Sequence, residues 1–483
     1  MTPMTANDRL EPLLMSALGV KPTADQYQAI REFCRFMSDA DPFSVMILRG
    51  SAGTGKTTLA AAVVRALVQL RHRIALLAPT GRAAKVMELY SCHTAFTIHR
   101  RIYRQKVAGT FSPFSLADNK TADCLFIVDE SSMIANQGLQ ESNFGTGRLL
   151  DDLIQYVYQG QNCRLLLVGD AAQLPPVGEE SSPALQSPCL QSYGLKVYEA
   201  DLQEVLRQSI ESGILFNATR IRCLTDTQAP IPMPKIRLQG FADIRTVRGD
   251  ELIESLASSY AEVGIDETMV LTRSNKRANI YNQGIRARIL DREDELTSGD
   301  MLMVVKNNYH WAAASGLQKE DEKPKLSFIA NGDRAQVLRV RKTRSFYGFR
   351  FADVTLRFPD YDDQELTATA ILDSLQSEAP ALTREQQQQL FDQVWADYAD
   401  IPHKKDRMDK LKQDPYYNAL QVKFAYAVTC HKAQGGQWQH IYIDQGYMTD
   451  DMLTPDYIHW LYTAFTRATG KLFLVNWAKE YTE

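Results

Sequence analysis

The chain has 483 residues of ordinary globular composition, 45% hydrophobic and 23% charged, which excludes collagen-like, disulfide-scaffold and disordered proteins. This length exceeds what one hydrophobic core supports, so we expect several domains. The net charge of −4 argues, taken alone, against a polybasic nucleic-acid binder and against an electrostatic membrane anchor. No stretch approaches the roughly 18 apolar residues of a membrane span, and acidic residues near the N-terminus argue against a secretion signal.

The seven cysteines are scattered along the chain, and no two form a CxxC pair. An odd number of dispersed thiols is typical of a reducing compartment and argues against structural zinc. We therefore expect a cytoplasmic protein that does not associate with a membrane.

The first two hundred residues alternate short apolar runs with helical patterns, which is typical of a parallel sheet covered by helices. Polar positions do not alternate within these runs, as expected when both sheet faces are buried. The predicted strands are Val45–Arg49, Ile74–Ala78, Leu125–Asp129 and Arg164–Gly169, with crossover helices at Thr57–Gln69 and Gly81–Leu89. Between His99 and Cys124 the pattern breaks at glycine, proline and polar residues, which predicts a small hairpin insertion at about residues 100–122.

A second alternating block follows a proline-rich loop around residues 230–234. Its predicted elements are the strands Met269–Thr272, Phe424–Val428, His440–Asp444 and Lys471–Val475 and the helix Ser274–Leu290. The block is interrupted by short β-like runs at Met301–Val305, Gln336–Val340 and Val354–Phe358. A helical pattern follows, in which Thr383 and Gln386 form a capping box. Its apolar face consists of Leu390, Phe391, Val394, Trp395 and Tyr398.

The negative charge is concentrated in one segment. Residues 359–423 contain 13 acidic and 7 basic residues, a net charge of −6 against −4 for the whole chain, so the remaining residues sum to +2. That near-neutral remainder is compatible with binding a nucleic-acid strand through local contacts. The acidic segment is expected to be a solvated helical face, a docking surface for a protein partner, or a gate that repels misplaced DNA.

A glycine-rich motif lies between a predicted strand and a predicted helix. Residues 50–57 fit GxxxxGK[ST], in which glycines let backbone N–H groups wrap phosphates at a helix N-terminus. Lys56 is expected to bridge the β- and γ-phosphates, and the Thr57 hydroxyl to bind Mg²⁺. The residues predicted to hold ATP are Gly50, Ser51, Ala52, Gly53, Thr54, Gly55, Lys56, Thr57 and Thr58.

Two further strand ends carry side chains that phosphate cleavage needs. Asp129 and Glu130 follow an apolar strand, where Asp129 is placed to bind Mg²⁺ and Glu130 to deprotonate the attacking water. Gln173 follows the strand that ends at Gly169 and is a candidate to hydrogen-bond the γ-phosphate. These patterns indicate a RecA-like ATPase and leave a kinase, a GTPase switch and a transporter ATPase open.

Further short motifs occur along the chain. They are Thr23–Ala29, Ala78–Ala84, Thr97–His99, Asp129–Met133, Gly169–Pro176, Leu206–Gln208, Val428–Gly435 and Leu461–Ala468. In order and spacing, this set resembles the motifs of superfamily 1 helicases and, within them, those of the RecD/Dda-like group, superfamily 1B. The resemblance extends from about residue 23 to residue 475, with Ala433 where the family usually has serine. A helix-rich stretch at about Asp373–Gln421 has no counterpart in it.

The resemblance implies an α/β fold with two RecA-like P-loop NTPase domains, each a parallel sheet with flanking helices. The first is expected at residues 1–205, with the hairpin acting as a pin that splits duplex. The second is expected at residues 206–295 and 423–483. Residues 296–422 would then form an SH3-like β insertion with an extra helical segment.

The implied activity is that of an ATP- and Mg²⁺-dependent DNA helicase, which moves 5′→3′ on single-stranded DNA and acts at its junctions with duplex. In this family Gln26 would read adenine, Gly435 would contact the nucleotide, and Arg207 and Arg467 would reach the γ-phosphate from across a cleft. The implied DNA contacts are Thr80, Arg82, His99, Thr429, His431 and Lys432 along the strand, with Phe111 and Phe114 on the pin.

Two other functions stay open. One is a related motor on RNA, although such helicases typically carry zinc-binding or other large accessory domains and this sequence shows no cluster of metal ligands. The other is a motor or adaptor subunit of a RecD-like exodeoxyribonuclease complex that does not itself unwind DNA. The sequence shows no nuclease-type set of carboxylates, which argues against nuclease activity of its own.

Overall fold

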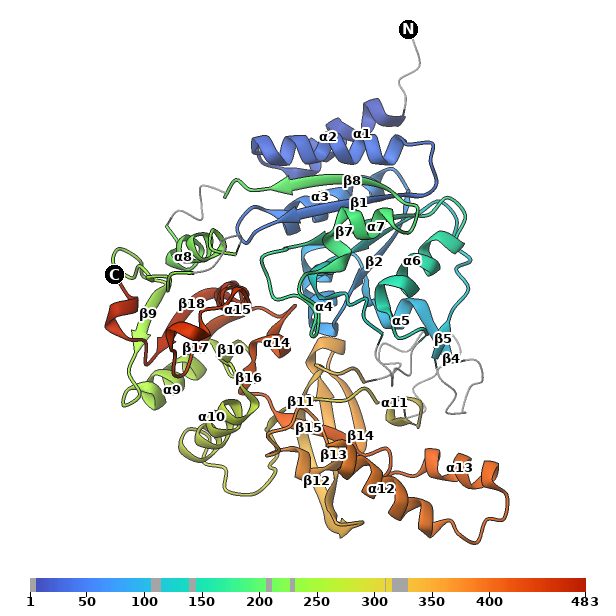
Figure 1. The fold of residues 1–483 in the computed structure, drawn as a ribbon, viewed down its shortest axis with the longest axis vertical. Coiled ribbons are helices and arrows are strands. Elements are labelled where there is room, and N and C mark those ends of the chain that lie inside the picture. The colour runs from blue at the N-terminus through green and yellow to red at the C-terminus, as the bar shows by residue number, and fades with distance from the viewer. Residues whose placement is uncertain are drawn as a thin grey trace.

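The computed structural model describes residues 6–105, 114–138, 145–205, 211–225, 231–308, 310–314 and 329–483. Two residues with predicted roles, Phe111 and Arg207, lie outside these ranges. Within them the chain forms two sheets of parallel strands covered by helices, a closed barrel and a helical arm (Figure 1). Among the helices of these ranges, none combines the length and the apolar character that crossing a membrane requires.

The first sheet has six parallel strands with helices on both faces, and we call it with its helices the first domain (Figure 1). In spatial order the strands are β3 (Ala95–Thr97), β2 (Arg73–Ala78), β6 (Cys124–Val128), β7 (Arg164–Gly169), β1 (Ser44–Gly50) and β8 (Lys196–Leu202). The helices are α1 (Ala6–Leu18), α2 (Ala24–Ser38), α3 (Lys56–Gln69), α4 (Gly81–Ser91), α5 (Ile98–Ile102), α6 (Leu149–Gln159) and α7 (Ser187–Gln191).

Alternate side chains of a strand in this sheet enter two different cores. On β1, Met46 and Leu48 pack with α1, α2 and α3, whereas Val45 and Ile47 pack with α5, α6 and α7. Burial on both faces explains why the predicted strands are unbroken apolar runs.

The insertion predicted after His99 is an antiparallel hairpin of β4 (Tyr103–Gln105) and β5 (Phe114–Leu116). The base of this hairpin is anchored to the first domain. The Tyr103 hydroxyl donates to Asp152 Oδ2 on α6 at 2.6 Å, and Phe114 packs against the same core.

The second sheet has five parallel strands taken from distant parts of the chain, and with its helices it forms the second domain (Figure 1). In spatial order they are β16 (Ala427–Thr429), β10 (Thr268–Thr272), β17 (Trp438–Asp444), β18 (Ala468–Val475) and β9 (Ile244–Val247). The helices are α8 (Gly213–Arg222), α9 (Leu252–Val263), α10 (Asn275–Arg288), α14 (Cys430–Ala433) and α15 (Pro455–Phe465).

Between β10 and β16 in sequence the chain builds a five-stranded closed barrel, which fits the predicted SH3-like insertion. Its strands are β11 (Met301–Val304), β12 (Arg334–Phe346), β13 (Phe349–Phe358), β14 (Gln364–Ile371) and β15 (Leu420–Phe424), with the short helix α11 (His310–Ala314) nearby.

The prediction of a single strand at Phe424–Val428 was wrong, because this run contains the end of one strand and the start of another. The barrel ends with β15 at Phe424, and the second sheet resumes with β16 at Ala427. At this corner the buried Asn282 side chain donates to the carbonyls of Phe424 and Ala427 at 3.2 and 2.9 Å. It also accepts from the N–H groups of Tyr426 and Ala427 at 3.1 and 2.7 Å. One asparagine thus satisfies the backbone groups that the corner removes from both sheets.

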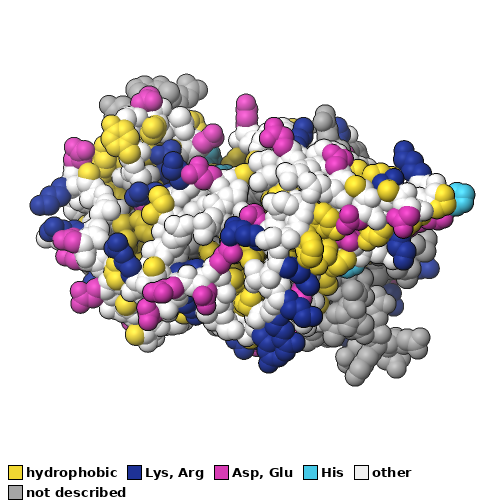
Figure 2. All heavy atoms as spheres, turned by 90° about the horizontal axis from the view of Figure 1, so that it is seen from below, with side chains coloured by type: hydrophobic (Ala, Val, Ile, Leu, Met, Phe, Trp, Pro, Cys, Tyr) yellow, Lys and Arg dark blue, Asp and Glu magenta, His cyan; other side chains and the backbone are white. Residues whose placement is uncertain are grey.

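The helical arm, formed by α12 (Arg384–Asp397) and α13 (Lys404–Gln413), projects from the barrel (Figure 1). The predicted capping box of Thr383 and Gln386 is confirmed at the start of α12. The predicted apolar face is also confirmed, since it packs with Phe349 and Phe351 of the barrel in a separate core. Seen from below, the arm carries acidic, basic and hydrophobic side chains together (Figure 2).

Candidate functional site

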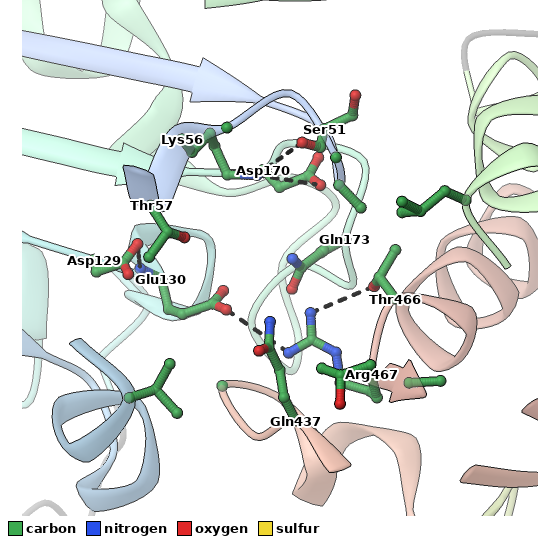
Figure 3. Close-up of a pocket in the computed structure, with 18 of the residues that line it drawn as sticks. Ser51, Lys56, Thr57, Asp129, Glu130, Asp170, Gln173, Gln437, Thr466 and Arg467 are labelled. Carbon is green, nitrogen blue, oxygen red and sulfur yellow. Dashed lines mark hydrogen bonds and ion pairs between the residues drawn. The ribbon is translucent and has the colours of Figure 1, made fainter. Parts of the chain in front are cut away.

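The glycine-rich motif forms a loop between β1 and α3, as its pattern predicts. Gly53 and Gly55 have φ values of 79° and 81°, which glycine adopts without strain. A Cβ at Gly50 would lie 2.9 Å from Lys56 Cγ, so this position has room only for glycine. The loop lines a cavity of about 420 Å³ through Ser51, Ala52, Gly53, Gly55, Lys56, Thr57 and Thr58 (Figure 3).

Side chains on both sides of this phosphate loop hold its shape. Lys56 Nζ donates to the Ser51 carbonyl at 3.1 Å and lies 3.9 Å from Asp170 Oδ2. The Gln26 amide donates to the Thr54 carbonyl at 3.0 Å from outside the cavity. In the structure Gln26 therefore supports the loop, and its contact with adenine stays a prediction.

Asp129 and Glu130 follow β6 and line the same cavity (Figure 3). The Glu130 N–H donates to Asp129 Oδ1 at 2.9 Å, and Glu130 has a left-handed φ of 51°. For a residue other than glycine this conformation costs free energy, which the surrounding structure must offset. Burial, together with the adjacent Glu130 carboxylate, raises the pKa of Asp129 to about 6. A cation beside Asp129 would relieve this cost.

The residues present fit a magnesium ion. The Thr57 hydroxyl and the Asp129 carboxylate are hard oxygen donors, and both line the cavity. Across the described ranges, no three His, Cys, Asp or Glu side chains gather as a metal cage. A magnesium ion held by one or two protein oxygens and by substrate phosphates is the arrangement that such a donor set favours.

The opposite wall of the cavity comes from the second domain. Arg467 follows α15, is buried, and places Nη1 at 3.7 Å from Glu130 Oε1 and 3.2 Å from the Gly436 carbonyl oxygen (Figure 3). Gly435, at φ 73°, packs so closely against α4 that a Cβ would lie 3.0 Å from Thr80 Oγ1. The structure thus brings Arg467 and Gly435 to the cavity that the phosphate loop lines.

Gln173 lies between the two walls (Figure 3). Its side chain is buried, and its Oε1 has no hydrogen-bond partner among the described residues. A buried polar atom without a partner costs free energy, which binding of substrate or water in the cavity would recover. Its predicted contact with the γ-phosphate is compatible with this position.

Sequence reasoning gave no role to several residues that join the two walls. The Tyr462 hydroxyl donates to Asp170 Oδ2 at 2.6 Å and accepts from the Ala52 N–H at 2.9 Å. Gln434 Nε2 donates to the Leu174 carbonyl at 2.7 Å. Asp170 carried a usable signal, as an acid directly after a buried strand. Tyr462 lies within the motif Leu461–Ala468, but its place on the apolar face of a helix did not indicate a role of its own.

The predicted DNA contacts of the first domain are engaged within the protein. The Thr80 hydroxyl caps the N-terminus of α4. Arg82 pairs with Asp360 of the barrel at 3.3 Å and with Glu267 of the second domain at 3.4 Å. Burial lowers the pKa of His99 to about 4, so this ring is neutral at physiological pH. Contact of these residues with DNA stays a prediction.

The remaining predicted DNA contacts lie near the barrel and the pin. Thr429 precedes α14, His431 is exposed on that helix, and Lys432 Nζ donates to the Asn331 side chain of the barrel. Burial lowers the pKa of Lys432 to about 8. Phe114 packs at the base of the hairpin. Their role in binding DNA also stays a prediction.

Two family models match the segments that build this cavity. Residues 37–179 match a model described as an AAA domain, and residues 424–475 match one described as a UvrD-like helicase C-terminal domain. The first segment contains the phosphate loop and both acids, and the second contains Arg467.

Three curated proteins are similar over different extents. The ATP-dependent DNA helicase Dda of Enterobacteria phage T4 is 24% identical over 80% of this chain and 84% of its own length. The ATP-dependent RecD2 DNA helicase of Deinococcus radiodurans is 34% identical over 28% of this chain and 16% of its own length. An uncharacterized protein of Methanocaldococcus jannaschii is 24% identical over 89% of this chain, which spans only 36% of that relative.

Solved Pif1 helicases align with nearly the whole chain at low similarity. A structure of Bacteroides Pif1 bound to ssDNA covers 96% of this chain and 94% of its own, with 15% identity and a TM-score of 0.46. Pif1 from Candida albicans has 14% identity and a TM-score of 0.42. The order of the motifs, the cavity between the two sheets and the sequence matches together support a superfamily 1B DNA helicase of the RecD/Dda type.

Proposed function

We propose that this chain is an ATP-dependent DNA helicase that translocates 5′→3′ on single-stranded DNA and separates the duplex ahead. The observation that carries the proposal is the cavity whose walls come from two parallel sheets, with Asp129 and Glu130 on one wall and Arg467 on the other. A site divided in this way is complete only when the domains are closed, so hydrolysis can be coupled to movement. The polarity rests on the superfamily 1B resemblance.

The proposal assigns a chemical role to each of the predicted catalytic residues. Lys56 leaves the Ser51 carbonyl and binds the β- and γ-phosphates. Magnesium, held by Thr57 and Asp129, would neutralise charge on the phosphates. Glu130 accepts a proton from the attacking water. Arg467 stabilises the charge that develops on the γ-phosphoryl group, assisted by Gln173 and Arg207.

The DNA strand is proposed to pass between the barrel and the two domains, which we assign to residues 1–205 and to 206–295 with 423–483. The hairpin β4–β5 would then divide the duplex at the junction. Opening one base-pair step costs roughly 1.4 kcal/mol, so the wedge needs rigidity more than strength. The anchoring of Tyr103 and Phe114 at the hairpin base supports this role.

Unwinding of partial duplexes with either a 5′ or a 3′ single-stranded tail tests activity and polarity in one comparison. We expect strand separation of the 5′-tailed duplex, dependent on ATP and Mg²⁺. Lys56→Ala and Glu130→Gln should each lower DNA-stimulated hydrolysis by about a hundredfold or more, because they remove the phosphate contact and the general base. Lys479→Ala, which changes an exposed lysine outside both the cavity and the hairpin insertion, is the control and should unwind like the wild type. Normal unwinding by Glu130→Gln would overturn the proposal.

The same preparation separates the alternative functions. Competition between DNA and RNA strands in the ATPase assay distinguishes a DNA motor from an RNA motor. Incubation with labelled linear DNA and Mg²⁺ tests for nuclease activity, which we expect to be absent. A cytoplasmic location and a protein partner at residues 359–423 are parts of the proposal. Affinity capture by the wild type and by a variant with the exposed arm carboxylates changed, Glu385→Gln and Asp392→Asn, tests the partner.

A further inference from the structure

One hydroxyl group connects the two walls of the cavity. Tyr462 on α15 is 1% exposed, and its hydroxyl donates to Asp170 Oδ2 at 2.6 Å. The same oxygen accepts from the Ala52 N–H in the phosphate loop at 2.9 Å. A side chain of the second domain therefore contacts both the loop and a carboxylate at a strand end of the first domain.

The Asp170 carboxylate has a second neighbour of opposite charge. Lys56 Nζ lies 3.9 Å from the same Oδ2, and Asp170 is 3% exposed, so solvent screens the pair little. The negative charge that Asp170 presents to Lys56 competes with phosphates for the ammonium group. A hydrogen bond from Tyr462 to this oxygen stabilises part of that charge and weakens the competition.

The direction of the Tyr462 hydrogen bond is fixed. Burial, with the neighbouring Asp170 charge, raises the pKa of Tyr462 well above its ordinary value, so the hydroxyl keeps its proton at physiological pH. Because that proton is donated to Asp170, the oxygen is left to accept from Ala52. Both contacts are lost together if α15 moves away.

Neighbouring contacts bind the loop of residues 170–174 to α15. Thr463 Oγ1 accepts from the Leu174 N–H at 2.8 Å, and His459 Nδ1 lies 2.8 Å from the Ala172 carbonyl oxygen. These contacts use the backbone of the loop, whereas Tyr462 reaches the carboxylate itself. The position of α15 therefore determines both where the loop lies and how its acid is partnered.

We propose that Tyr462 is a positioning residue for ATP binding, whose hydroxyl stabilises the Asp170 charge and so weakens its attraction for Lys56 while the second domain is docked. When α15 withdraws, Asp170 attracts Lys56 more strongly and the hold on the phosphates weakens. ATP affinity is thereby linked to domain closure, and by reciprocity ATP favours the closed form. The inference rests on the proposed function, since it assigns this cavity to ATP.

Tyr462→Phe tests the inference by removing a single oxygen atom. We expect the affinity for a fluorescent ATP analogue with Mg²⁺, measured without DNA, to fall about tenfold, as for loss of a hydrogen bond to a charged group. In the ATPase assay the KM for ATP should rise by a similar factor, while kcat changes less. Tyr457→Phe is the matched control, because Tyr457 lies on the same helix, is buried, and donates to Gln445 Oε1 at 2.8 Å within the second domain. It should bind ATP like the wild type.

Asp170→Asn tests the opposite direction. It removes the competing charge and keeps an oxygen for the Ala172 N–H, which Asp170 Oδ1 now accepts at 3.1 Å. We expect unchanged or tighter ATP binding, and a Tyr462→Phe/Asp170→Asn variant that binds more tightly than Tyr462→Phe alone. Unchanged affinity in Tyr462→Phe, or no recovery in the double variant, would overturn the inference.

A structural role for the hydroxyl, a failure of the helicase proposal and a failure of the Tyr462 inference give different results. A purely structural role for the hydroxyl would lower the melting temperature and the active fraction without changing the affinity of the folded molecules. If the wild type binds ATP but shows no DNA-stimulated hydrolysis, the helicase proposal fails, and the comparison of ATP affinities still decides the role of Tyr462. If the wild type unwinds DNA and Tyr462→Phe binds ATP normally, the Tyr462 inference alone fails.

Discussion

Asp129 is a residue at which function and stability are opposed. Burial beside Glu130 raises its pKa from 3.8 to about 6. Because the folded state then holds the proton more tightly than the unfolded state, the stabilising contribution is fully present below about pH 4 and is lost as the pH rises through 6. At neutral pH the ionised carboxylate destabilises the fold, and we infer that a cation site requires this charge.

Asp129→Asn is expected to raise the melting temperature at pH 7.5 in Mg²⁺-free buffer by roughly 2–4 °C while abolishing ATP hydrolysis. The stability difference should shrink on acidification and vanish near pH 4, where both side chains are neutral. Thermal unfolding between pH 4 and pH 8 measures this difference. A wild type that is more stable than the variant at pH 7.5 in that buffer would contradict the explanation.

The residues that gather at the cavity were predictable to different degrees. Lys56, Asp129 and Glu130 each follow the end of a parallel strand, and such ends meet at one edge of a sheet, so local sequence predicts their proximity. Tyr462 reaches the same place from another domain. Its position depends on how two separately folded sheets dock, which no local pattern encodes.

Asn282 performs at one corner the hydrogen bonding that strands perform elsewhere in a sheet. Asn282→Ala would leave buried backbone groups of the β15–β16 corner without partners, so we expect the free energy of unfolding to fall by about 2–4 kcal/mol. Asn279→Ala is the matched control on the same helix, because among the described residues Asn279 donates to the carbonyls of Gln376 and Ser377 and not to the corner. In this control variant the free energy of unfolding should fall by less than about 1 kcal/mol. Urea unfolding followed by circular dichroism compares the two, and equal losses would refute this role of Asn282.

Most of the strands that end in a motif could be predicted from the sequence. The elements that were predicted wrongly or in part have physical explanations. The run predicted at Gln336–Val340 is part of the longer β12, whose second half is mostly exposed and pairs with β13. Hydrophobic pattern does not reveal such a strand, because cross-strand pairing rather than burial supports it. The corner within Phe424–Val428 could not be predicted because every residue of this run is hydrophobic and buried, including those of the corner itself.

The three folded units of the molecule meet at Trp438. Arg82 of the first domain and Arg334 of the barrel lie with Cζ at 5.8 and 6.0 Å from its ring centre. Salt bridges extend this junction, from Arg82 to Asp360 at 3.3 Å and from the neighbouring α4 lysine to Asp362 at 2.8 Å. Part of the excess negative charge of residues 359–423 therefore faces cations of the first domain. Composition could not predict this pairing, because it gives only the net charge of the segment and not the position of each charge.

Domain movement should therefore change the surroundings of Trp438. We expect a non-hydrolysable ATP analogue to alter the tryptophan emission of the wild type, because closure changes the contacts of both arginines with the ring. Trp438→Phe should lose most of this change. Trp477→Phe removes another buried tryptophan, on the chain beyond β18, and should keep it. A full response in Trp438→Phe would show that the junction does not move with nucleotide.

The interruption of the second sheet by the barrel has a consequence for the order of events during synthesis. Domains emerging from the ribosome fold from the N-terminal side, so the phosphate loop is formed long before Arg467 has been translated. Strand β10 must wait for β16 and β17, and closure of the barrel through β11 and β15 brings those late strands beside it. A nascent chain would therefore present the phosphate loop before it can cleave ATP, with the weaker affinity that we infer for the loop without α15, and nucleotide bound at that stage would stabilise the first domain while the second is still being made.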